Sequence, residues 1–386
     1  MVKKKLVFLS NTFGHYQIPL CSTWNDLCDF TFVTTKPMSE QMKRLGFTDW
    51  SKVYPYVLNA WESEESRNKA MALCEQADIV IAGACDELYL KKRLSENKLT
   101  FRFTERLFKK GKISLLKPKN FKTLYEKHIS NRKKNYYVLC TGADAPKDFR
   151  FLGLPKDRLL KWGYFPAVPD IDVDALLKAR RERTLQIIWV GRFVALKKPE
   201  MAIRAAAYLK EQGIPFAMQM LGIGPLEDEM RSLVRSLGLQ ECVSLPGSKP
   251  AEEVITCMEQ SDIFMMNSDK QEGWGAVISE AMGSGCACVV SDEAGAARVL
   301  IKQDETGIYY PCRDQEKLNR ALYRVATDTA LREKLSRNAY AQMKALWNGA
   351  VAAERLLRFS DGLLENGSAK AYPNGPVSLA LGESND

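Results

Sequence analysis

Two carboxylates flank a glycine turn in the segment Q-E-G-W-G-A-V-I-S-E, with Glu272 near one end and Glu280 at the other. The two glycines of the G-W-G turn at 273–275 let backbone amides approach a ligand closely. A short helix starting near Ala276 would add free N–H groups and a dipole that favours an anion. The carboxylates can accept hydrogen bonds from hydroxyls of a sugar or ribose. The segment therefore predicts a site for a ligand that has both an anionic group and hydroxyls.

Two cations stand at a predicted strand-to-helix turn further upstream. The run I-I-W-V-G-R-F-V-A-L-K-K-P-E turns at Gly191 and offers Arg192 and Lys197 before the next helix. Arginine provides a planar fork of donors and lysine a point charge, a pair suited to holding a diphosphate. Gly222 and Gly224, in L-G-I-G-P, follow a further predicted strand. Loops after successive parallel strands lie at one edge of a sheet, so these residues are predicted to lie together.

Apolar runs alternate with helical patterns along most of the chain, which predicts parallel sheets built from strand–helix–strand units. Because 386 residues exceed what one hydrophobic core usually serves, we predict an α/β protein with two Rossmann-like, doubly wound domains facing a cleft. The predicted strands lie near residues 6–9, 30–34, 79–82, 99–103 and 136–140, and then near 187–190, 217–221, 243–245, 263–266, 288–291 and 307–310. The helices predicted in the first half span residues 18–26, 64–76, 87–95 and 121–130.

Composition shifts predict the domain boundaries. We expect a first domain over 1–165, a hinge linker over 166–184 and a second domain over 185–345. A C-terminal helix over 346–365 is expected to pack back on the first domain, and the Gly-, Ser- and Asn-rich residues 366–386 are expected to be a disordered tail. The acidic run D-I-D-V-D suggests a metal site, but its Pro-rich surroundings at the domain boundary favour the linker.

The ten cysteines contain no C-x-x-C pair and the chain has only two histidines, His15 and His128, so neither a zinc site nor a disulfide framework is predicted. The N-terminal apolar run is too short for a signal peptide, and no segment is apolar enough to span a membrane. Neither a G-x-G-x-x-G after the first strand nor a P-loop occurs. We expect a cytoplasmic protein, which would be peripheral on the inner face of the plasma membrane if its basic surface binds lipid.

That basic surface is predicted from residues 91–134, where lysines and arginines crowd and only three glutamates oppose them, within a net charge of +9. One interpretation is a solvated basic face. The other is contact with anionic lipid headgroups or an anionic acceptor, because apolar residues alternate with the charges. Nucleic acid is not expected as a partner, because no known module accompanies the charge. The apolar residues concerned are Leu107, Phe108, Ile113, Leu115 and Leu116.

The ordered motifs G-R-x4-K, G-x-G-P, L-P-G and E-G-W-G-x4-E-A-M resemble the retaining glycosyltransferases of family four, which have the GT-B fold. The resemblance spans Leu185 to Leu346. The first domain is similar more loosely, in the Gly14 loop after its first strand and in the closing segment L-G-L-P-K-D-R-L-L-K-W-G-Y-F-P. The resemblance implies a nucleotide-sugar donor domain over 185–345 and an acceptor-side domain over 1–165.

By resemblance, Arg192 and Lys197 would bind the donor diphosphate and Glu272 would hold hydroxyls of the donor sugar. Glu280 would accept a hydrogen bond from the ribose. Trp274 could either stack on the sugar or simply pack. The remaining residues implied to contact the donor are Gly14, Gly191, Gly222, Gly224, Pro246, Gly247, Gly273 and Gly275. No metal or other cofactor is implied, because cations and a helix N-terminus offset the leaving charge.

This sequence departs from the family where many members have a histidine after a middle strand of the first domain. It has R-F-T-E-R there, so Glu105 or Arg106 takes that place or belongs to the basic surface. His15, just after the first strand, is the other candidate for contact with the reacting groups. The segment S-D-K-Q-E is also one residue longer than the common form, which affects where Asn267 and Ser268 lie.

The resemblance implies transfer of a sugar with retention from a nucleotide diphosphate donor, UDP or GDP, to a glycan or lipid-linked acceptor in polysaccharide synthesis. The usual glycosidase arrangement is disfavoured because the second carboxylate would be occupied by ribose. Two alternatives remain. One is a hydrolase or epimerase of nucleotide sugars with the same fold, and the other is a non-catalytic nucleotide-sugar-binding protein at the membrane surface.

Overall fold

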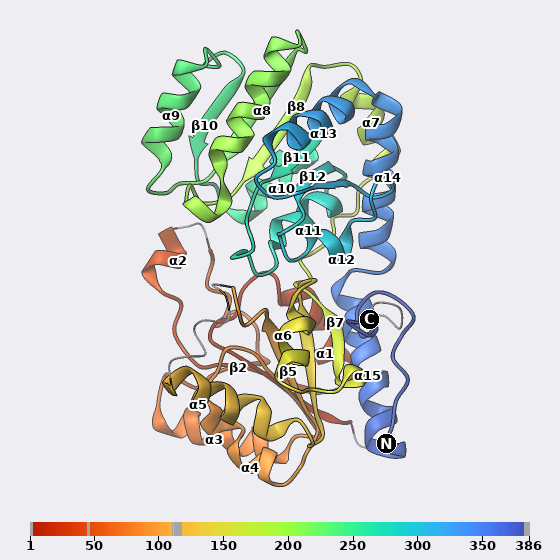
Figure 1. Ribbon diagram of the computed structural model, residues 1–386. Coiled ribbons are helices and arrows are strands. Elements are labelled where there is room, and N and C mark those ends of the chain that lie inside the picture. Colours follow the sequence, from red (N-terminus) through yellow and green to blue (C-terminus); the bar gives the residue numbers. More distant parts are fainter. Residues whose placement is uncertain (1–2, 45–46, 110, 112–117, 382–386) are drawn as a thin grey trace. The chain divides into compact units, whose positions relative to one another are not determined.

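The computed structural model of the chain describes residues 3–44, 47–109, 111 and 118–381. The chain forms two compact units. Unit 1 consists of Met1–Lys43, Thr48–Pro166 and Leu346–Asp386, and most of unit 2 is the continuous segment Ala167–Ala345. In Figure 1, unit 1 contains the red to yellow elements and the blue C-terminal helix, and unit 2 contains the elements from yellow-green to blue.

Within the described residues, unit 1 has a sheet of seven parallel strands in the order β3-β2-β1-β4-β5-β6-β7. The strands are β1 (Lys5–Ser10), β2 (Asp29–Thr34), β3 (Val57–Asn59), β4 (Ile79–Ala82), β5 (Thr100–Glu105), β6 (Tyr136–Thr141) and β7 (Leu159–Trp162). The helices along this part of the chain, with the C-terminal helix, are α1 (Ile18–Leu27), α2 (Glu40–Arg44), α3 (Glu64–Gln76), η1 (Glu87–Tyr89), α4 (Lys91–Ser95), α5 (Pro118–Lys127), η3 (Ile129–Asn131), α6 (Ala145–Phe151), η4 (Lys156–Arg158) and α15 (Gly349–Asn366).

The strand order of unit 1 reverses at β1. Strands β2 and β3 lie successively on one side of β1, and β4 pairs with the other side of β1. In parallel α/β sheets, ligands bind outside the carboxyl ends of the strands at such a reversal. The loops concerned in unit 1 are residues 11–17 after β1 and 83–86 after β4.

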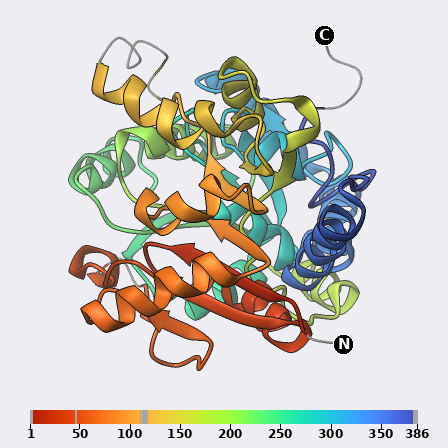
Figure 2. The same cartoon turned by 90° about the horizontal axis from the view of Figure 1, so that it is seen from below.

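Helix α15 packs on α1 within unit 1, as Figures 1 and 2 show for the blue helix. The indole Nε1 of Trp24 donates a hydrogen bond to the carbonyl oxygen of Ala353 over 3.1 Å. A Cβ at Gly349 would lie 2.6 Å from the backbone nitrogen of Leu20, so only glycine permits this approach of the two helices.

The expectation of a disordered tail from Asn366 is wrong for residues 367–381, which pair with the edge strand β7. The amide of Val377 donates to the carbonyl oxygen of Lys161 over 2.9 Å, and the amide of Lys161 donates to that of Ser378 over 2.7 Å. Val377 and Ser378 are almost completely buried. An edge strand offers unpaired backbone groups, and composition alone does not predict that a polar segment will take them.

Unit 2, over the described residues, has a sheet of six parallel strands in the order β10-β9-β8-β11-β12-β13. The strands are β8 (Leu185–Val190), β9 (Phe216–Leu221), β10 (Val243–Gly247), β11 (Ile263–Met266), β12 (Ala287–Ser291) and β13 (Ile308–Tyr310). The helices are α7 (Val173–Arg180), η5 (Ala195–Lys197), α8 (Pro199–Glu211), α9 (Glu227–Ser236), α10 (Ala251–Glu259), α11 (Ala276–Gly283), α12 (Ala297–Leu300), α13 (Gln315–Thr327) and α14 (Thr329–Ala345).

The sheet of unit 2 is covered on both faces, which is why β11 and β12 are buried along their whole length. Helix α8 buries an apolar stripe at helical spacing, including Ala202, Ala205 and Leu209. The order reverses between β8 and β11, so the loops at 191–198 and 267–275 mark the expected binding edge.

The predicted class of doubly wound parallel sheets is confirmed in both units. Strands β3 and β7 were not predicted, because three or four residues carry too little pattern. Helix α7 lies inside the predicted linker, and its N-cap Asp172 accepts hydrogen bonds from the amides of Asp174 and Ala175. Part of the acidic run thus caps a helix. The predicted cleft between the domains stays a prediction.

No three His, Cys, Asp or Glu side chains of the described residues are grouped so that they could hold a metal ion. Over the same part of the chain, every helix is too short or too polar to cross a bilayer.

Candidate functional site

Lys197 and Glu272 meet at the strand-order reversal of unit 2. Lys197 ends the loop after β8 and Glu272 lies in the loop after β11, and the ammonium forms an ion pair with the Oε2 atom of the carboxylate. Both side chains are largely buried, with 13% and 16% of their surface exposed. The amide of Asp269 donates to the carbonyl oxygen of Leu196 over 2.8 Å, which joins the two loops directly. A paired cation and carboxylate therefore stand where a ligand is expected.

The glycine turn after Glu272 takes a backbone conformation that requires glycine. Gly275 has φ of +84°, and a Cβ there would lie 2.8 Å from the Cε atom of Met266. Gly275 is also the N-cap of α11, and no side chain caps this helix end. The first amides of α11 therefore need partners other than a capping side chain, and an anion can fill that role.

Gly222 and Gly224 let the loop after β9 run against the loop after β8. Gly222 has φ of +145°, and its Cβ would lie 1.9 Å from the carbonyl oxygen of Gly191. A Cβ at Gly224 would lie 2.5 Å from the carbonyl oxygen of Phe193. The amides of Gly191 and Phe193 donate to the β9 strand and loop over 3.0 Å each. These glycines thus act through close backbone packing that holds the β8 loop in place.

Arg192 is exposed and lies in the same loop after β8 as Lys197. Among the described residues its guanidinium forms no ion pair or side-chain hydrogen bond. Its donors are therefore available to a ligand. Further along the same edge, Pro246 is exposed and Gly247 has φ of +91° with open space around its Cβ position. The amide of Gly222 donates to the carbonyl oxygen of Gly247 over 2.8 Å, which joins the β9 and β10 loops.

Glu280 and Trp274 are buried in unit 2. Glu280 lies in the second turn of α11 with 5% of its surface exposed. Trp274 is 1% exposed, and its indole Nε1 donates to the Oγ atom of Ser279 over 3.3 Å. Of the two interpretations of Trp274, the packing role fits this burial, because no face of the ring is open for stacking.

Asn267 and Ser268 are polar residues at the end of β11 to which the sequence analysis assigned no role. Both are fully buried. The Nδ2 atom of Asn267 donates to the hydroxyl of Tyr310 over 2.7 Å, and burial raises the pKa of that hydroxyl. The Oδ1 atom of Asn267 and the Oγ atom of Ser268 have no hydrogen-bond partner among the described residues. Polar residues directly after a central strand were the available signal, which the extra residue in S-D-K-Q-E obscured.

Gly14, His15 and Glu105 belong to unit 1, at the carboxyl edge of its sheet. The amide of Gly14 donates to the Oε1 atom of Gln17 over 2.9 Å, which closes the turn before α1. The ring of His15 lies 3.8 Å from that of Tyr16, measured between centroids. Glu105 ends β5 and forms an ion pair with Lys109.

Two tyrosines that the sequence analysis did not name connect these residues. The ring centroid of Tyr16 lies 5.8 Å from that of Tyr164, which follows β7. The hydroxyl of Tyr164 donates to the Oε1 atom of Glu105 over 3.3 Å. His15, in the loop after β1, and Glu105, at the end of β5, are thus linked through two half-buried rings. The position of Tyr164 directly after β7 could have indicated its role, but the sequence did not predict β7.

The second histidine has a structural role. His128 is 4% exposed, and its Nδ1 atom lies 2.9 Å from the hydroxyl of Tyr136. Burial, with smaller effects of Arg102 and Lys127, lowers the pKa of His128 to about 3. Arg102 itself is buried and paired with Glu87 over 2.7 Å. His128 is therefore neutral and fixed in the core of unit 1.

The described part of the basic stretch 91–134 includes α5, which buries none of its residues. Phe121 and Tyr125, one helical turn apart, are 52% and 50% exposed, and their ring centroids lie 6.5 Å apart. Lys119 and Lys122 lie on the same helix. In Figures 1 and 2, α5 is the amber helix at the periphery of unit 1. Ile113, Leu115 and Leu116, which contributed to the predicted apolar pattern, lie outside the described residues.

Residues 177–342 match the model of the family described as "Glycosyl transferases group 1". The chain is 34% identical over 143 residues to the "Putative colanic acid biosynthesis glycosyltransferase WcaL" of Escherichia coli, covering 36% of this chain and 35% of that protein. It is 29% identical over 185 residues to the "Amylovoran biosynthesis glycosyltransferase AmsK" of Erwinia amylovora, covering 47% of this chain and 45% of that one. The matches thus span between a third and a half of these curated relatives.

Solved structures extend the likeness over most of the chain at the level of the fold. A glycosyltransferase from Rickettsia africae superimposes with a TM-score of 0.69 at 15% identity, covering 94% of this chain and 99% of that one. The Anabaena protein Alr3699/HepE, solved in complex with UDP, superimposes with a TM-score of 0.66 at 15% identity, covering 92% and 98%.

Proposed function

Because residues 177–342 match the model of the group 1 glycosyltransferases, we propose that the chain is a retaining GT-B glycosyltransferase. It moves a sugar from a nucleoside diphosphate sugar to a glycan or lipid-linked acceptor in polysaccharide synthesis. Relatives named for colanic acid and amylovoran biosynthesis support this class of product.

The observation that carries the proposal is the Lys197–Glu272 pair next to the uncapped start of α11. A nucleoside diphosphate sugar presents a diphosphate beside sugar hydroxyls. Lys197, the exposed fork of Arg192 and the α11 amides supply positive potential for the diphosphate. Glu272 supplies acceptor oxygens for hydroxyls of the sugar. The ion pair neutralises both groups until the ligand offers each of them a second partner.

In the proposed reaction, the oxygen of an acceptor hydroxyl forms a bond to C1 of the donor sugar on the face that the diphosphate leaves. The bond between C1 and the diphosphate oxygen breaks, and its electron pair stays on the diphosphate. The proton of the acceptor hydroxyl passes to a diphosphate oxygen. Arg192, Lys197 and the helix start stabilise the charge that develops on this leaving group, which is where fixed cations lower a barrier most.

For the nucleoside we propose uridine, bound near Pro246 and Gly247, with the ribose hydroxyls directed at Glu280. The neighbour of similar fold solved with UDP supports this choice. On the acceptor side we propose His15 and Glu105, because Tyr16 and Tyr164 link them along the carboxyl edge of the sheet in unit 1.

We also propose that α5 touches an anionic membrane surface. Its exposed Phe121 and Tyr125 are suited to the headgroup boundary, and Lys119 and Lys122 favour anionic lipid. We expect less of the double variant Phe121→Ser/Tyr125→Ser than of the unaltered protein to sediment with phosphatidylglycerol vesicles. Phosphatidylcholine vesicles are expected to bind neither of these two proteins. Equal sedimentation of the double variant and the unaltered protein would contradict this role.

The test of the proposed function is calorimetric titration with UDP, GDP and ADP, followed by incubation with UDP-sugars with and without acceptors. We expect UDP to bind with the highest affinity and to be released from the donor faster when an acceptor glycan is added. Free sugar or an epimer formed at full rate from donor alone would support the hydrolase or epimerase instead. Binding without turnover on every acceptor would support the non-catalytic alternative.

A further inference from the structure

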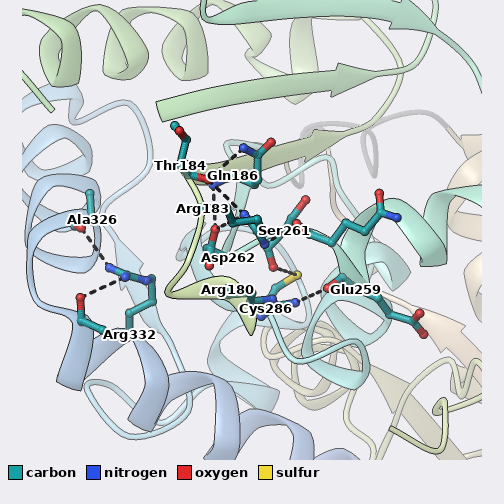
Figure 3. A network of polar contacts seen from close by, with 12 residues as sticks. Arg180, Arg183, Thr184, Gln186, Glu259, Ser261, Asp262, Cys286, Ala326 and Arg332 are labelled. Carbon is teal, nitrogen blue, oxygen red and sulfur yellow. Dashed lines mark hydrogen bonds and ion pairs between the residues drawn. The ribbon is translucent and has the colours of Figure 1, made fainter. Parts of the chain in front are cut away.

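Arginines gather at the amino-terminal edge of the sheet in unit 2, opposite the edge that carries Lys197 and Glu272 (Figure 3). The most buried of them is Arg180, the last residue of α7, with 6% of its surface exposed. Nothing in the proposed reaction uses this side chain.

Arg180 joins the carboxyl ends of two helices. One guanidinium nitrogen donates to the carbonyl oxygen of Gly285, just after α11, over 2.6 Å. The other donates to that of Glu259, the last residue of α10, over 2.7 Å. Longer contacts reach the carbonyl oxygens of Met258 and Ser284. The last carbonyls of a helix lack partners within it and carry partial negative charge, so one guanidinium stabilises both ends.

A neighbouring ion pair, between Arg183 and Asp262, connects the start of β8 to the start of β11. The Oδ2 atom of Asp262, directly before β11, accepts hydrogen bonds from Arg183 over 2.9 Å and from the amide of Gln186 over 2.7 Å. Arg183 also donates to the carbonyl oxygen of Gln260 over 2.7 Å. Arg180, Arg183 and Asp262 together are called the arginine clasp. It holds the chain at the entry to β8, the entry to β11 and the exit from α11.

The elements held by the clasp carry the candidate site at their other ends. β8 leads to Arg192 and Lys197, and β11 leads to the loop that contains Glu272. α11 leaves that loop at Gly275 and ends beside the clasp. β11 has only four residues, so about 13 Å of strand separates its two ends. Buried, close-packed elements of this length move as rigid bodies.

We propose that Arg180 is a positioning residue for the donor site. By holding the exit of α11 against the end of α10, where the chain enters β11, it sets the spacing between β11 and α11. That spacing decides how far Glu272 and the first α11 amides stand from Lys197. The expected effect of Arg180 on nucleotide binding rests on the proposed function. Its expected effect on the mobility of residues 267–280 does not depend on that function.

Arg332 provides a matched control. It is also a partly buried arginine that donates to carbonyl oxygens at a helix end, those of Val325 and Ala326 in α13, over 2.9 Å each (Figure 3). α13 carries none of the residues assigned to the site. Loss of Arg332 therefore reports the general cost of removing such an arginine.

The experiment compares Arg180→Ala with Arg332→Ala by thermal unfolding, and at 15 °C by UDP titration and by hydrogen exchange of residues 267–280. Both variants are expected to lower the melting temperature. Only Arg180→Ala is expected to weaken UDP binding, by about tenfold, and to speed amide exchange in 267–280 several-fold. Arg180→Lys keeps the charge but not the planar fork that spans two helices. Relative to Arg180→Ala, it should therefore recover more of the melting temperature than of the UDP affinity.

Equal UDP affinity and equal exchange in the two alanine variants would overturn the proposal. If Arg180→Ala does not fold, Arg180→Lys against Arg332→Lys gives the same comparison. If the unaltered protein does not bind UDP, the proposed function fails. Faster exchange of 267–280 in the Arg180 variant alone would then still establish the positioning role, and its absence would still refute it.

Discussion

In unit 1 the strands run in the order β3-β2-β1-β4-β5-β6-β7, and β10-β9-β8-β11-β12-β13 of unit 2 repeats the first six of those positions. The loops at the carboxyl edges of the two sheets differ. Unit 2 has an ion pair, glycines at left-handed or crowded positions and an uncapped helix start. Unit 1 has half-buried aromatic rings around Glu105. The shared frame thus presents one edge suited to a diphosphate and another suited to hydroxyls and apolar ring faces.

The family model matches residues 177–342, all of which lie in unit 2. A diphosphate with its sugar makes the same demands in many enzymes, so we expect loops that bind it, as proposed for unit 2, to keep recognisable spacing. Fold is therefore shared by both units, whereas function resides in their loops.

The largest effect is expected from removing either partner of the ion pair in unit 2. Lys197→Ala should lower kcat/KM for the donor by about a thousandfold and weaken UDP binding, because it removes the cation that we propose lies at the leaving group. Glu272→Ala should lower kcat comparably but leave UDP binding equal or tighter, because a carboxylate near the diphosphate is gone. UDP titration and a coupled assay for UDP release measure both.

The control for these variants is Lys198→Gly, which removes the adjacent lysine at a position with φ of +45° and so relieves backbone strain. It should retain most activity. Intact transfer by Glu272→Ala would show that the assignment of unit 2 is wrong.

A second comparison concerns two glycines of unit 2. Gly222→Ala places a Cβ against the carbonyl oxygen of Gly191 and should cost about 3 kcal/mol or more of unfolding free energy, with loss of UDP binding. Gly213 also has positive φ, of +70°, but nothing lies within 4 Å of its Cβ position. Gly213→Ala should therefore cost only about 1 kcal/mol. Denaturant unfolding compares them, and equal losses would show that backbone crowding at Gly222 is unimportant.

In unit 1, Glu105→Gln and Tyr164→Phe remove the carboxylate and the hydroxyl that meet over 3.3 Å. Each should raise the KM for acceptor about tenfold while leaving UDP affinity unchanged, because lost hydrogen bonds to a substrate hydroxyl cost on the order of 1 kcal/mol. Tyr323→Phe, at an exposed position of α13 in unit 2, is the matched control. A change of UDP affinity with no change of acceptor KM would contradict the assignment of unit 1 to the acceptor.

The last comparison, whose effect is smallest near neutral pH, separates the units by pH, since both histidines of the chain lie in unit 1. Because the pKa of His128 is about 3 when folded, below its ordinary value near 6.5, the unfolded state binds more protons between those values. The contribution of His128 to the free energy of unfolding is therefore fully present above about pH 6.5. It falls by about 1.4 kcal/mol per pH unit as the pH falls from 6.5 toward 3. Unfolding of unit 1 in His128→Gln should depend less steeply on pH than in the unaltered chain. Parallel curves would contradict this.

Much of the fold was predictable because strands buried on both faces leave continuous apolar runs, as in β11 and β12. The short strands β3 and β7 were not, and neither was the order of residues 367–381, which depends on the free edge of β7. In the site, residue types and spacing indicated Arg192, Lys197 and Glu272. They could not indicate Tyr164 or Arg180, because each acts on residues distant in sequence.

By itself the sequence determined two parallel-sheet domains and the residues at the carboxyl edge of the second, since hydrophobic periodicity and loop motifs are local properties. The tertiary structure decided that Lys197 and Glu272 form a pair, that Gly222 and Gly224 serve backbone packing and that Trp274 is buried. It also brought Arg180 to the far ends of the elements that carry the site. Such contacts depend on which strands become neighbours, and that pairing results from packing of the whole sheet.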